Sequence, residues 1–267
     1  MEFDIGYRNL TTLHGIDFPD NITELNCSGN QLTSLQYCPE SVQILKCSYN
    51  QLTSLQYCPQ GLQILQCDWV HLTSLQYCPQ GLQKLDCGFN LLTSLQGCPE
   101  SLRVLDCSGN NLISLQYCPH GLQKLNCSGN NLISLQYCPE SVQILKCSHN
   151  QLTSLQYCPK GLKTLFCDHN QLTSLQYFPE ELEVLYYGYD NPLLPEYQNK
   201  DLDEIKLINY GKRFKEGLKI INNQITNQKA IIIQRCWDNY WYRPDEQGIS
   251  RHAVRGIQNW KEMKLKQ

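Results

Sequence analysis

The chain has 267 residues, of which 41% are hydrophobic and 18% are charged, and its formal net charge is −3 at pH 7. This composition is too apolar for a disordered protein. The longest aliphatic run, Ile231 to Ile233, is far too short for a membrane-spanning helix, which needs about 20 apolar residues. The first ten residues, MEFDIGYRNL, do not resemble a signal peptide. We therefore expect a folded cytoplasmic protein that contacts no membrane.

Residues 1–21 precede a long internal repeat and contain an imperfect copy of part of it. The segment LTTLHGIDFPD, which starts at Leu10, has two more residues than the matching segments further along the chain. Phe18 stands where Cys38 stands in the next copy. Because an array of stacked repeats must cover the open ends of its core, we expect residues 1–21 to form an N-terminal cap.

Residues 22–192 are built from 20-residue units that share the frame LxxLxCxxNxLxxLxxCPxx, loosely in the last unit. The stretches 40–59 and 140–159 differ only at Tyr49 and His149. Side chains alternate between the two faces of a strand, so Leu45 and Cys47 share an apolar face. One short strand cannot bury that face alone, and the units are expected to stack as a parallel sheet of nine strands. The nine units begin at Ile22, Val42, Leu62, Leu82, Leu102, Leu122, Val142, Leu162 and Leu182.

The frame also predicts what lies between the strands. The return segment from Asn50 to Pro59 is too short and too interrupted by proline for a good helix, so the outer wall should be largely non-helical. The repeated asparagine should bond backbone groups of neighbouring turns, and Val70, which replaces it once, should weaken that ladder. Both repeated cysteines occupy apolar slots. We expect them to be buried, reduced thiols that bind no metal or cofactor.

Each unit resembles the leucine-rich repeat, whose signature LxxLxLxxNxL is matched by Val42, Leu45, Cys47, Asn50 and Leu52. The 20-residue length and the LTSLxxCP segment are similar to the short repeats of secreted bacterial effectors. The near-identical copies carrying LQYCP also resemble leucine-rich-repeat proteins of giant amoebal viruses, which would place the chain in a host cytoplasm. The resemblance implies a curved solenoid that binds a partner on its concave inner face.

Residues 193–267 lose the repeat and take up a helical period from Asp201, a plausible helix N-cap. Further helices are expected over Ala230–Tyr242 and from Ser250, and we interpret residues 193–267 as a C-terminal helical cap. Residues 236–238 read CWD, which resembles the CxD motif of a ubiquitin-ligase domain found with similar repeats, but too little chain remains for that domain. A faint IQ-like pattern begins at Ile233. A capping helix is the simpler interpretation of both.

The residues free to vary on the inner face are where binding specificity is expected. Two residues after the repeat cysteine, Tyr49, Trp69 and Phe89 stand in consecutive units and predict an aromatic strip, with Asp68 and Asp86 beside it. A second set of candidates follows along the same face: His149, Phe166, His169 and Tyr186. Repeat drift without any ligand is the alternative for this column.

Three other kinds of chemistry find little support. His149 and His169 should be neighbours near Asp168, but exposed histidines of a duplicated repeat are more often plain surface, and we expect no metal there. No common phosphate, zinc-protease or hydrolase motif occurs, so we expect no enzyme. Residues 1–199 carry 8 basic and 17 acidic residues, a poor surface for nucleic acid.

The sequence therefore predicts a non-catalytic scaffold or adaptor that binds a protein partner on the concave face of a leucine-rich-repeat solenoid. The alternative is a structural component that associates with itself and has no separate ligand.

Overall fold

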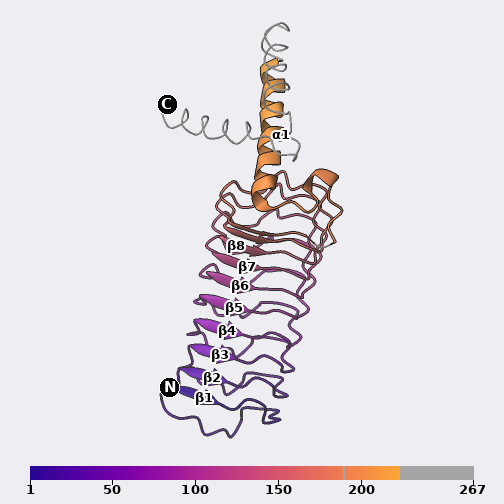
Figure 1. Cartoon of the computed structure of the whole chain (residues 1–267). Helices are drawn as coiled ribbons and strands as arrows, with labels where there is room; N and C mark the ends of the chain where they lie inside the picture. The colour runs from indigo at the N-terminus through magenta and orange to yellow at the C-terminus, as the bar shows by residue number, and fades with distance from the viewer. Residues whose placement is uncertain (189, 223–267) are drawn as a thin grey trace, which may run out of the picture. The chain divides into compact units, whose positions relative to one another are not determined.

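The computed structural model describes residues 1–188 and 190–222, and Met1–Lys206 forms one compact unit. Its ten strands lie in chain order in a single parallel sheet, one strand for each turn of a solenoid (Figure 1). The strands are β1 (Glu2–Asp4), β2 (Glu24–Asn26), β3 (Ile44–Lys46), β4 (Ile64–Gln66), β5 (Lys84–Asp86), β6 (Val104–Asp106), β7 (Lys124–Asn126), β8 (Ile144–Lys146), β9 (Thr164–Phe166) and β10 (Val184–Tyr186).

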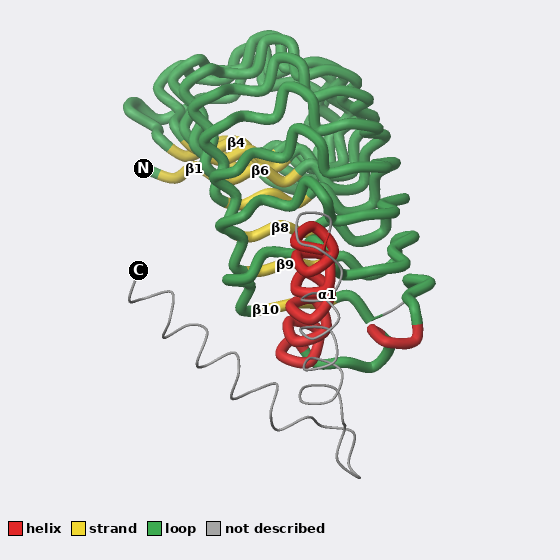
Figure 2. The backbone as a smooth tube through the Cα atoms, turned by 90° about the horizontal axis from the view of Figure 1, so that it is seen from above, coloured by secondary structure: helices red, strands yellow, loops and turns green. Residues whose placement is uncertain are grey.

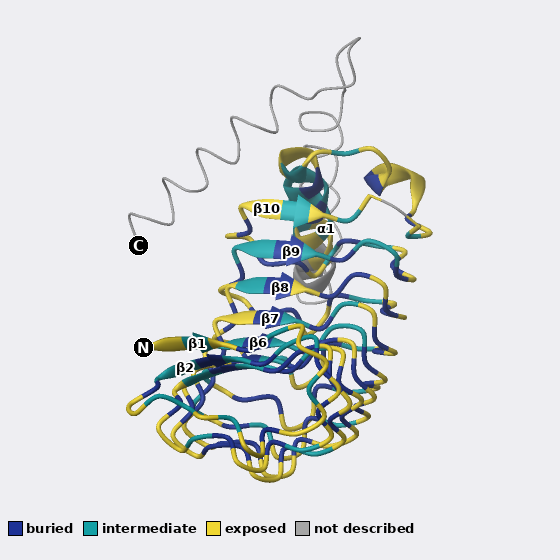
Figure 3. Ribbon diagram, turned by 90° about the horizontal axis from the view of Figure 1, so that it is seen from below, coloured by how far each residue is buried: buried dark blue, intermediate teal, exposed yellow. Residues whose placement is uncertain are grey.

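The register of the sheet follows the repeat. From β2 to β10 each residue pairs with the residue 20 positions further on, as Leu45 does with Leu65. The middle residue of each strand points into the core, and Figure 3 shows it as a dark blue centre in β8 and β9. Both Leu45 and the following Cys47 are fully buried, as the alternation predicts. We call the opposite, solvent-facing side of the strands the sheet face.

The return segments confirm the prediction of a non-helical wall. Between Asn26 and Val184 the segments that connect the strands contain turns and bends, and the described chain has no helix there. Figure 2 shows these connections as loops on the side of the solenoid opposite the strands. A 20-residue turn leaves no room for a helix beside the strand and its two corners.

The N-terminal segment adds one strand to the nine that the repeat predicts. Strand β1 pairs with β2 at an offset of 22 residues, so that Phe3 lies beside Leu25. Ile5 is buried in the slot that Cys27 fills in the next turn. Phe18 is half-buried, and its ring centroid lies 5.7 Å from that of Phe3. This turn is two residues longer than the 20-residue frame, so the repeat does not predict its strand.

The repeated asparagines form the predicted ladder. The Nδ2 atom of Asn50 donates to the carbonyl oxygens of Cys27 and Cys47, at 3.0 and 2.9 Å, and its Oδ1 accepts from Leu32 N at 2.9 Å. Each amide therefore ties its own turn to the turn before it. In the last turn one extra residue shifts this role to Asn191, which bonds Cys167 O at 2.9 Å.

Val70 interrupts the ladder, as the sequence predicts. The amide of Leu72 still reaches Asn90 Oδ1 at 2.8 Å, but the side chain of Val70 cannot accept from the preceding turn. The buried N–H of Leu52, one turn earlier, has no hydrogen-bond partner among the residues that the structure describes. One turn of the solenoid therefore carries an unsatisfied buried donor.

The two cysteine columns lie in the core as free thiols. The column from Cys27 to Cys167 is fully buried, and in the second column only Cys98 and Cys138 are half-buried. Desolvation raises the pKa of the Cys27 thiol to about 12. The Sγ atom of Cys47 also donates to Gln66 O in the next turn at 3.3 Å, a contact that the sequence did not suggest.

The end of the repeats passes through a short helix, η1 (Pro195–Tyr197), into α1 (Leu202–Asn222). The N-cap prediction is confirmed: Asp201 Oδ1 accepts from Glu204 N at 2.8 Å, and Glu204 Oε2 accepts from Asp201 N at 3.0 Å. Lys206 Nζ donates to Leu182 O at 2.7 Å.

The remaining helical predictions, Ala230–Tyr242 and the segment from Ser250, lie outside the described residues, as do Cys236 and the IQ-like pattern. The division into two caps and a solenoid with boundaries after residues 21 and 192 stays a prediction. Within the described residues, no helix has the length and apolar character needed to cross a membrane.

Candidate functional site

The variable column of the sheet face lies where each strand ends and the chain turns. We use this name for the residues two positions after each repeat cysteine, and all of its described members have a positive φ, between 50° and 66°. Glycine adopts this left-handed conformation freely, whereas side chains with a Cβ are strained in it. The column consists of Gly29, Tyr49, Trp69, Phe89, Gly109, Gly129, His149 and His169.

The structure brings the three predicted aromatics together as an aromatic strip of Tyr49, Trp69 and Phe89. The rings of Tyr49 and Trp69 are stacked with centroids 6.1 Å apart, and those of Trp69 and Phe89 are stacked at 4.5 Å. About half of each side chain is exposed. The strip ends because Gly109 follows: a Cβ there would come within 2.6 Å of the Phe89 ring, which lies over the glycine.

Two acidic residues, Asp68 and Asp86, stand within three residues of the strip in the chain. Asp68 directly precedes Trp69, and its Oδ1 accepts a hydrogen bond from Ser48 Oγ. Asp86 is the last residue of β5 and pairs in register with Asp106. Desolvation, followed by the nearby charge of Asp106, raises the pKa of Asp86 to about 6. At pH 7, above this pKa, the carboxyl group of Asp86 is largely ionised.

The second set of predicted residues forms a separate cluster further along the sheet face. The rings of Phe166 and Tyr186, on β9 and β10, are stacked at 4.4 Å. Lys146 Nζ lies 5.4 Å from the centre of the Phe166 ring, a cation–π contact. Gly109 and Gly129 leave two turns without a side chain in the variable column. The predicted residues therefore form two patches and not one continuous surface.

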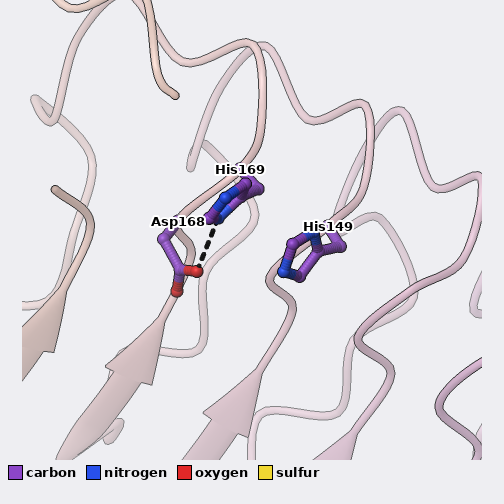
Figure 4. A group of neighbouring side chains, drawn as sticks. All are labelled: His149, Asp168 and His169. Carbon is purple, nitrogen blue, oxygen red and sulfur yellow. Dashed lines mark hydrogen bonds and ion pairs between the residues drawn. The ribbon is translucent and has the colours of Figure 1, made fainter. Parts of the chain in front are cut away.

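The two histidines of the variable column are neighbours, as the repeat predicts. The rings of His149 and His169 are stacked with centroids 4.0 Å apart. His169 Nδ1 lies 2.9 Å from Asp168 Oδ2, the contact that Figure 4 marks with a dashed line. Desolvation opposes ionisation of Asp168, but hydrogen bonds from Ser148 and His169 outweigh it and lower the pKa of this carboxyl group. We call His149, Asp168 and His169 the histidine cluster.

A row of exposed tyrosines on the return segments was not singled out from the sequence. Each stands directly before the cysteine of the LQYCP segment and is at least half exposed, and from Tyr37 to Tyr137 each has a positive φ between 66° and 72°. The signal in the sequence is an aromatic residue repeated at a position that the core does not need. The row consists of Tyr37, Tyr57, Tyr77, Tyr117, Tyr137 and Tyr157, with Tyr177 exposed at the same place.

Solved structures with the same architecture are leucine-rich-repeat proteins. YopM from Yersinia pestis, a leucine-rich effector protein, is 32% identical over 67% of this chain and 52% of its own, with a TM-score of 0.59. YopM from Yersinia enterocolitica is 28% identical over 69% of this chain and 47% of its own, with a TM-score of 0.56. No protein-family model and no curated protein matches the sequence.

Two further solved structures are similar to this chain. The functional domain of InlJ from Listeria monocytogenes, which includes a cysteine ladder, is 27% identical over 69% of this chain and 42% of its own, with a TM-score of 0.55. TLR13 in complex with a single-stranded RNA is 25% identical over 65% of this chain and 30% of its own, with a TM-score of 0.52.

The chain spans about half the length of the first of these structures. What they share with it is the solenoid of stacked parallel strands. The chain thus has the leucine-rich-repeat fold, a solenoid whose architecture is that of an interaction scaffold.

Proposed function

We propose that the chain is a non-catalytic scaffold that binds a protein partner through the aromatic strip of its sheet face. The observation that carries the proposal is the backbone conformation of the variable column. Glycine fills this left-handed position in three turns, whereas Tyr49, Trp69 and Phe89 occupy it at a cost of about 1 kcal/mol each. Half-exposed side chains that are kept in a strained conformation, with no role in the core, favour a role in binding.

The chemistry of the partner follows from the surroundings of the strip. Stacked aromatic rings bury much apolar area and lose little conformational entropy on binding. The carboxyl groups of Asp68 and Asp86 place negative charge beside the rings. A peptide segment with apolar and basic side chains complements this surface, and the same charge disfavours the phosphates of nucleic acid. Trp69, in the middle of the strip, is the proposed anchor.

A peptide-display selection on the full chain tests the proposal. We expect the selected sequences to combine apolar with basic residues. We then expect Trp69→Gly to weaken binding of a selected peptide about 30-fold, which corresponds to about 2 kcal/mol. Because glycine is the unstrained residue of this column, the variant should melt at the temperature of the wild type or above it.

The matched control is Tyr117→Gly, which removes an equally exposed aromatic residue from a left-handed position on the return side. It should leave peptide binding unchanged. Equal binding by the wild type and by Trp69→Gly would remove the strip from consideration and turn attention to His149, Phe166, His169 and Tyr186.

The second candidate function is self-association, and the return-segment tyrosines favour it. Their row, which Gly97 interrupts, offers exposed aromatic rings at the same spacing to a second copy of the chain. Light scattering over a concentration series would then reveal dimers without any added partner. Tyr77→Ser together with Tyr117→Ser should abolish them. A monomer at every concentration would contradict this candidate.

We further propose the cytoplasm as the site of action, a host cytoplasm if the resemblance to proteins of giant viruses reflects the source. The support is chemical: 15 cysteines among the described residues are free, and a reducing compartment keeps such thiols reduced.

A further inference from the structure

The histidine cluster brings three metal-ligating side chains to one place on the sheet face, apart from the aromatic strip. His149, Asp168 and His169 each offer a ligand atom, and these atoms lie within 4.8 Å of one another. They come from two consecutive turns, so their separation is fixed by the pairing of β8 with β9. In Figure 4 the Asp168 carboxylate and both imidazole rings lie side by side at the ends of these strands.

The carboxylate of Asp190, which is not part of the cluster, contacts the imidazole ring of His169. Asp190 Oδ2 lies 3.2 Å from His169 Nε2, while His169 Nδ1 faces Asp168. When a histidine nitrogen binds a metal, its other nitrogen commonly donates to a carboxylate, which orients the ring and raises its basicity. Asp190 stands in the position of that outer carboxylate if the Nδ1 side of His169 takes the metal.

The charge of residues 1–199 as a whole also favours a cation. Asp168 accepts a hydrogen bond from Ser148, which fixes one of its oxygens and leaves Oδ2 on the side of the histidines. Residues 1–199 carry an excess of nine acidic residues over basic ones, so a positive ion is attracted to this solenoid.

We propose that His149, His169 and Asp168 bind one divalent transition-metal ion of the zinc type, with solvent filling the remaining coordination positions. Two imidazoles and one carboxylate form a donor set that suits Zn²⁺, Cu²⁺ or Ni²⁺ and does not suit Ca²⁺ or Mg²⁺. Ligand atoms around a tetrahedral Zn²⁺ lie about 3.3 Å apart. The atoms of the cluster must therefore close by up to about 1.5 Å, which the exposed His149 ring can do by turning about its χ angles.

The repeat supplies its own comparison for this site. Residues 40–59 and 140–159 differ only at position 49 or 149, so His149→Tyr turns one stretch into a copy of the other. The tyrosine that this variant introduces already occupies the same position of the frame at Tyr49. His169→Gly likewise restores the residue found at this column position in the turns of Gly109 and Gly129.

Calorimetric titration of the full, reduced chain with Zn²⁺ tests the site. We expect one Zn²⁺ per wild-type chain, and we expect His149→Tyr and His169→Gly each to lower the affinity about tenfold or more while the melting temperature stays unchanged. The matched control is His120→Gln, because His120 is an exposed histidine that faces a carboxylate of Glu100 at 3.4 Å on the return side. It should bind Zn²⁺ like the wild type.

Absorption spectra with Co²⁺ separate this site from the cysteines. Nitrogen and oxygen ligands give no thiolate-to-cobalt charge-transfer band, and we expect none. Absence of binding to the wild type, equal binding by all variants, or a thiolate band would each overturn the proposal. The site is independent of the aromatic strip, so loss of peptide binding in Trp69→Gly would leave it unaffected.

Discussion

Two stretches of the solenoid, residues 40–59 and 140–159, have the same sequence except at Tyr49 and His149 and yet differ in their contacts with the neighbouring turns. Their bonds to the preceding turn are equivalent: Asn50 Nδ2 donates to Cys27 O and Asn150 Nδ2 to Cys127 O, both at 3.0 Å. A single frame therefore builds the same turn twice, and the differences must come from the neighbouring turns.

The neighbours change both the energetics and the surface of these two stretches. The amide of Leu152 donates to Asn170 Oδ1 at 3.0 Å, whereas that of Leu52 meets Val70 and stays unsatisfied. On the sheet face, Lys46 pairs with Glu24 at 2.6 Å, while Lys146 lies over the Phe166 ring. Identical turns thus acquire distinct properties from the side chains one turn away, which is how a copied repeat can carry more than one site.

The largest expected effect tests whether the two turns are equivalent in the core. Leu45→Ala and Leu145→Ala each remove a fully buried side chain from the middle of a strand. We expect each to lower the free energy of unfolding by about 3 kcal/mol, measured by urea denaturation followed by circular dichroism. Values that differ by more than about 1 kcal/mol would show that the two turns are not interchangeable.

The second prediction exchanges the ladder residue that follows each stretch. Asn170→Val removes four hydrogen bonds and leaves the N–H of Leu152 unpaired, so we expect a loss of about 2 kcal/mol. The reciprocal change, Val70→Asn, supplies an acceptor for Leu52 and should add about 1 kcal/mol. Urea denaturation measures both. A destabilising Val70→Asn would mean that the packing of Val70 outweighs the missing bond.

The third prediction concerns the buried thiols of both stretches. Cys47 Sγ donates to Gln66 O and Cys147 Sγ to Phe166 O, each at 3.3 Å. A serine hydroxyl can make the same bond, so Cys47→Ser and Cys147→Ser should each cost only about 1 kcal/mol. Cys47→Val, which keeps the apolar character and loses the donor, is the control for packing. A loss of unfolding free energy above about 3 kcal/mol in either serine variant would show that the serine hydroxyl does not replace the thiol in this hydrogen bond.

The smallest effect is a pH dependence set by the burial of Asp86 and, to a lesser extent, by a carboxyl group on the next strand. Desolvation and then Asp106 raise the pKa of Asp86 from 3.8 to about 6 in the folded chain. Because the pKa of Asp86 is higher in the folded than in the unfolded chain, its protonated form favours folding. This contribution to the free energy of unfolding is complete below pH 3.8 and is lost as the pH rises through about 6. Asp86→Asn should remove this loss and stabilise the protein at pH 7 by about 1 kcal/mol, a figure reduced for solvent screening.

Thermal melting of both proteins at pH 5 and pH 7 checks the prediction. Asp106→Asn should remove only the smaller, electrostatic part. If the melting temperatures of the wild type and of Asp86→Asn changed equally with pH, the raised pKa of Asp86 would be contradicted.

Much of the fold follows from the sequence because one frame recurs. The core positions of Leu45 and Cys47, the asparagine ladder, the interruption at Val70 and the N-cap at Asp201 all follow from local pattern. Strand β1 was not predicted, since its turn is two residues longer than the frame. The same reasoning fails at the last turn, where an extra residue moves the ladder to Asn191 and brings Asp190 to His169.

The sequence predicted which residues belong to the candidate site. It did not predict that they form two separate patches. Adjacent members of one column must be neighbours, so the stacking of Tyr49 on Trp69 follows from the repeat. The left-handed backbone at these positions, the ring of Phe89 over Gly109 and the thiol–carbonyl bonds depend on torsion angles. The raised pKa of Asp86 depends on burial as well as on the spacing of two carboxylates, and spacing alone does not reveal burial.

The constant offset of 20 residues between paired strands sets a rule for how the gene can change length. Inserting or deleting one whole repeat leaves every strand in register, because the new turn meets the same frame on both sides. Recombination between near-identical copies makes changes of that size. A change of any other length must be absorbed at the ends of the array, and both irregular turns, at Phe3 and at Asn191, lie there.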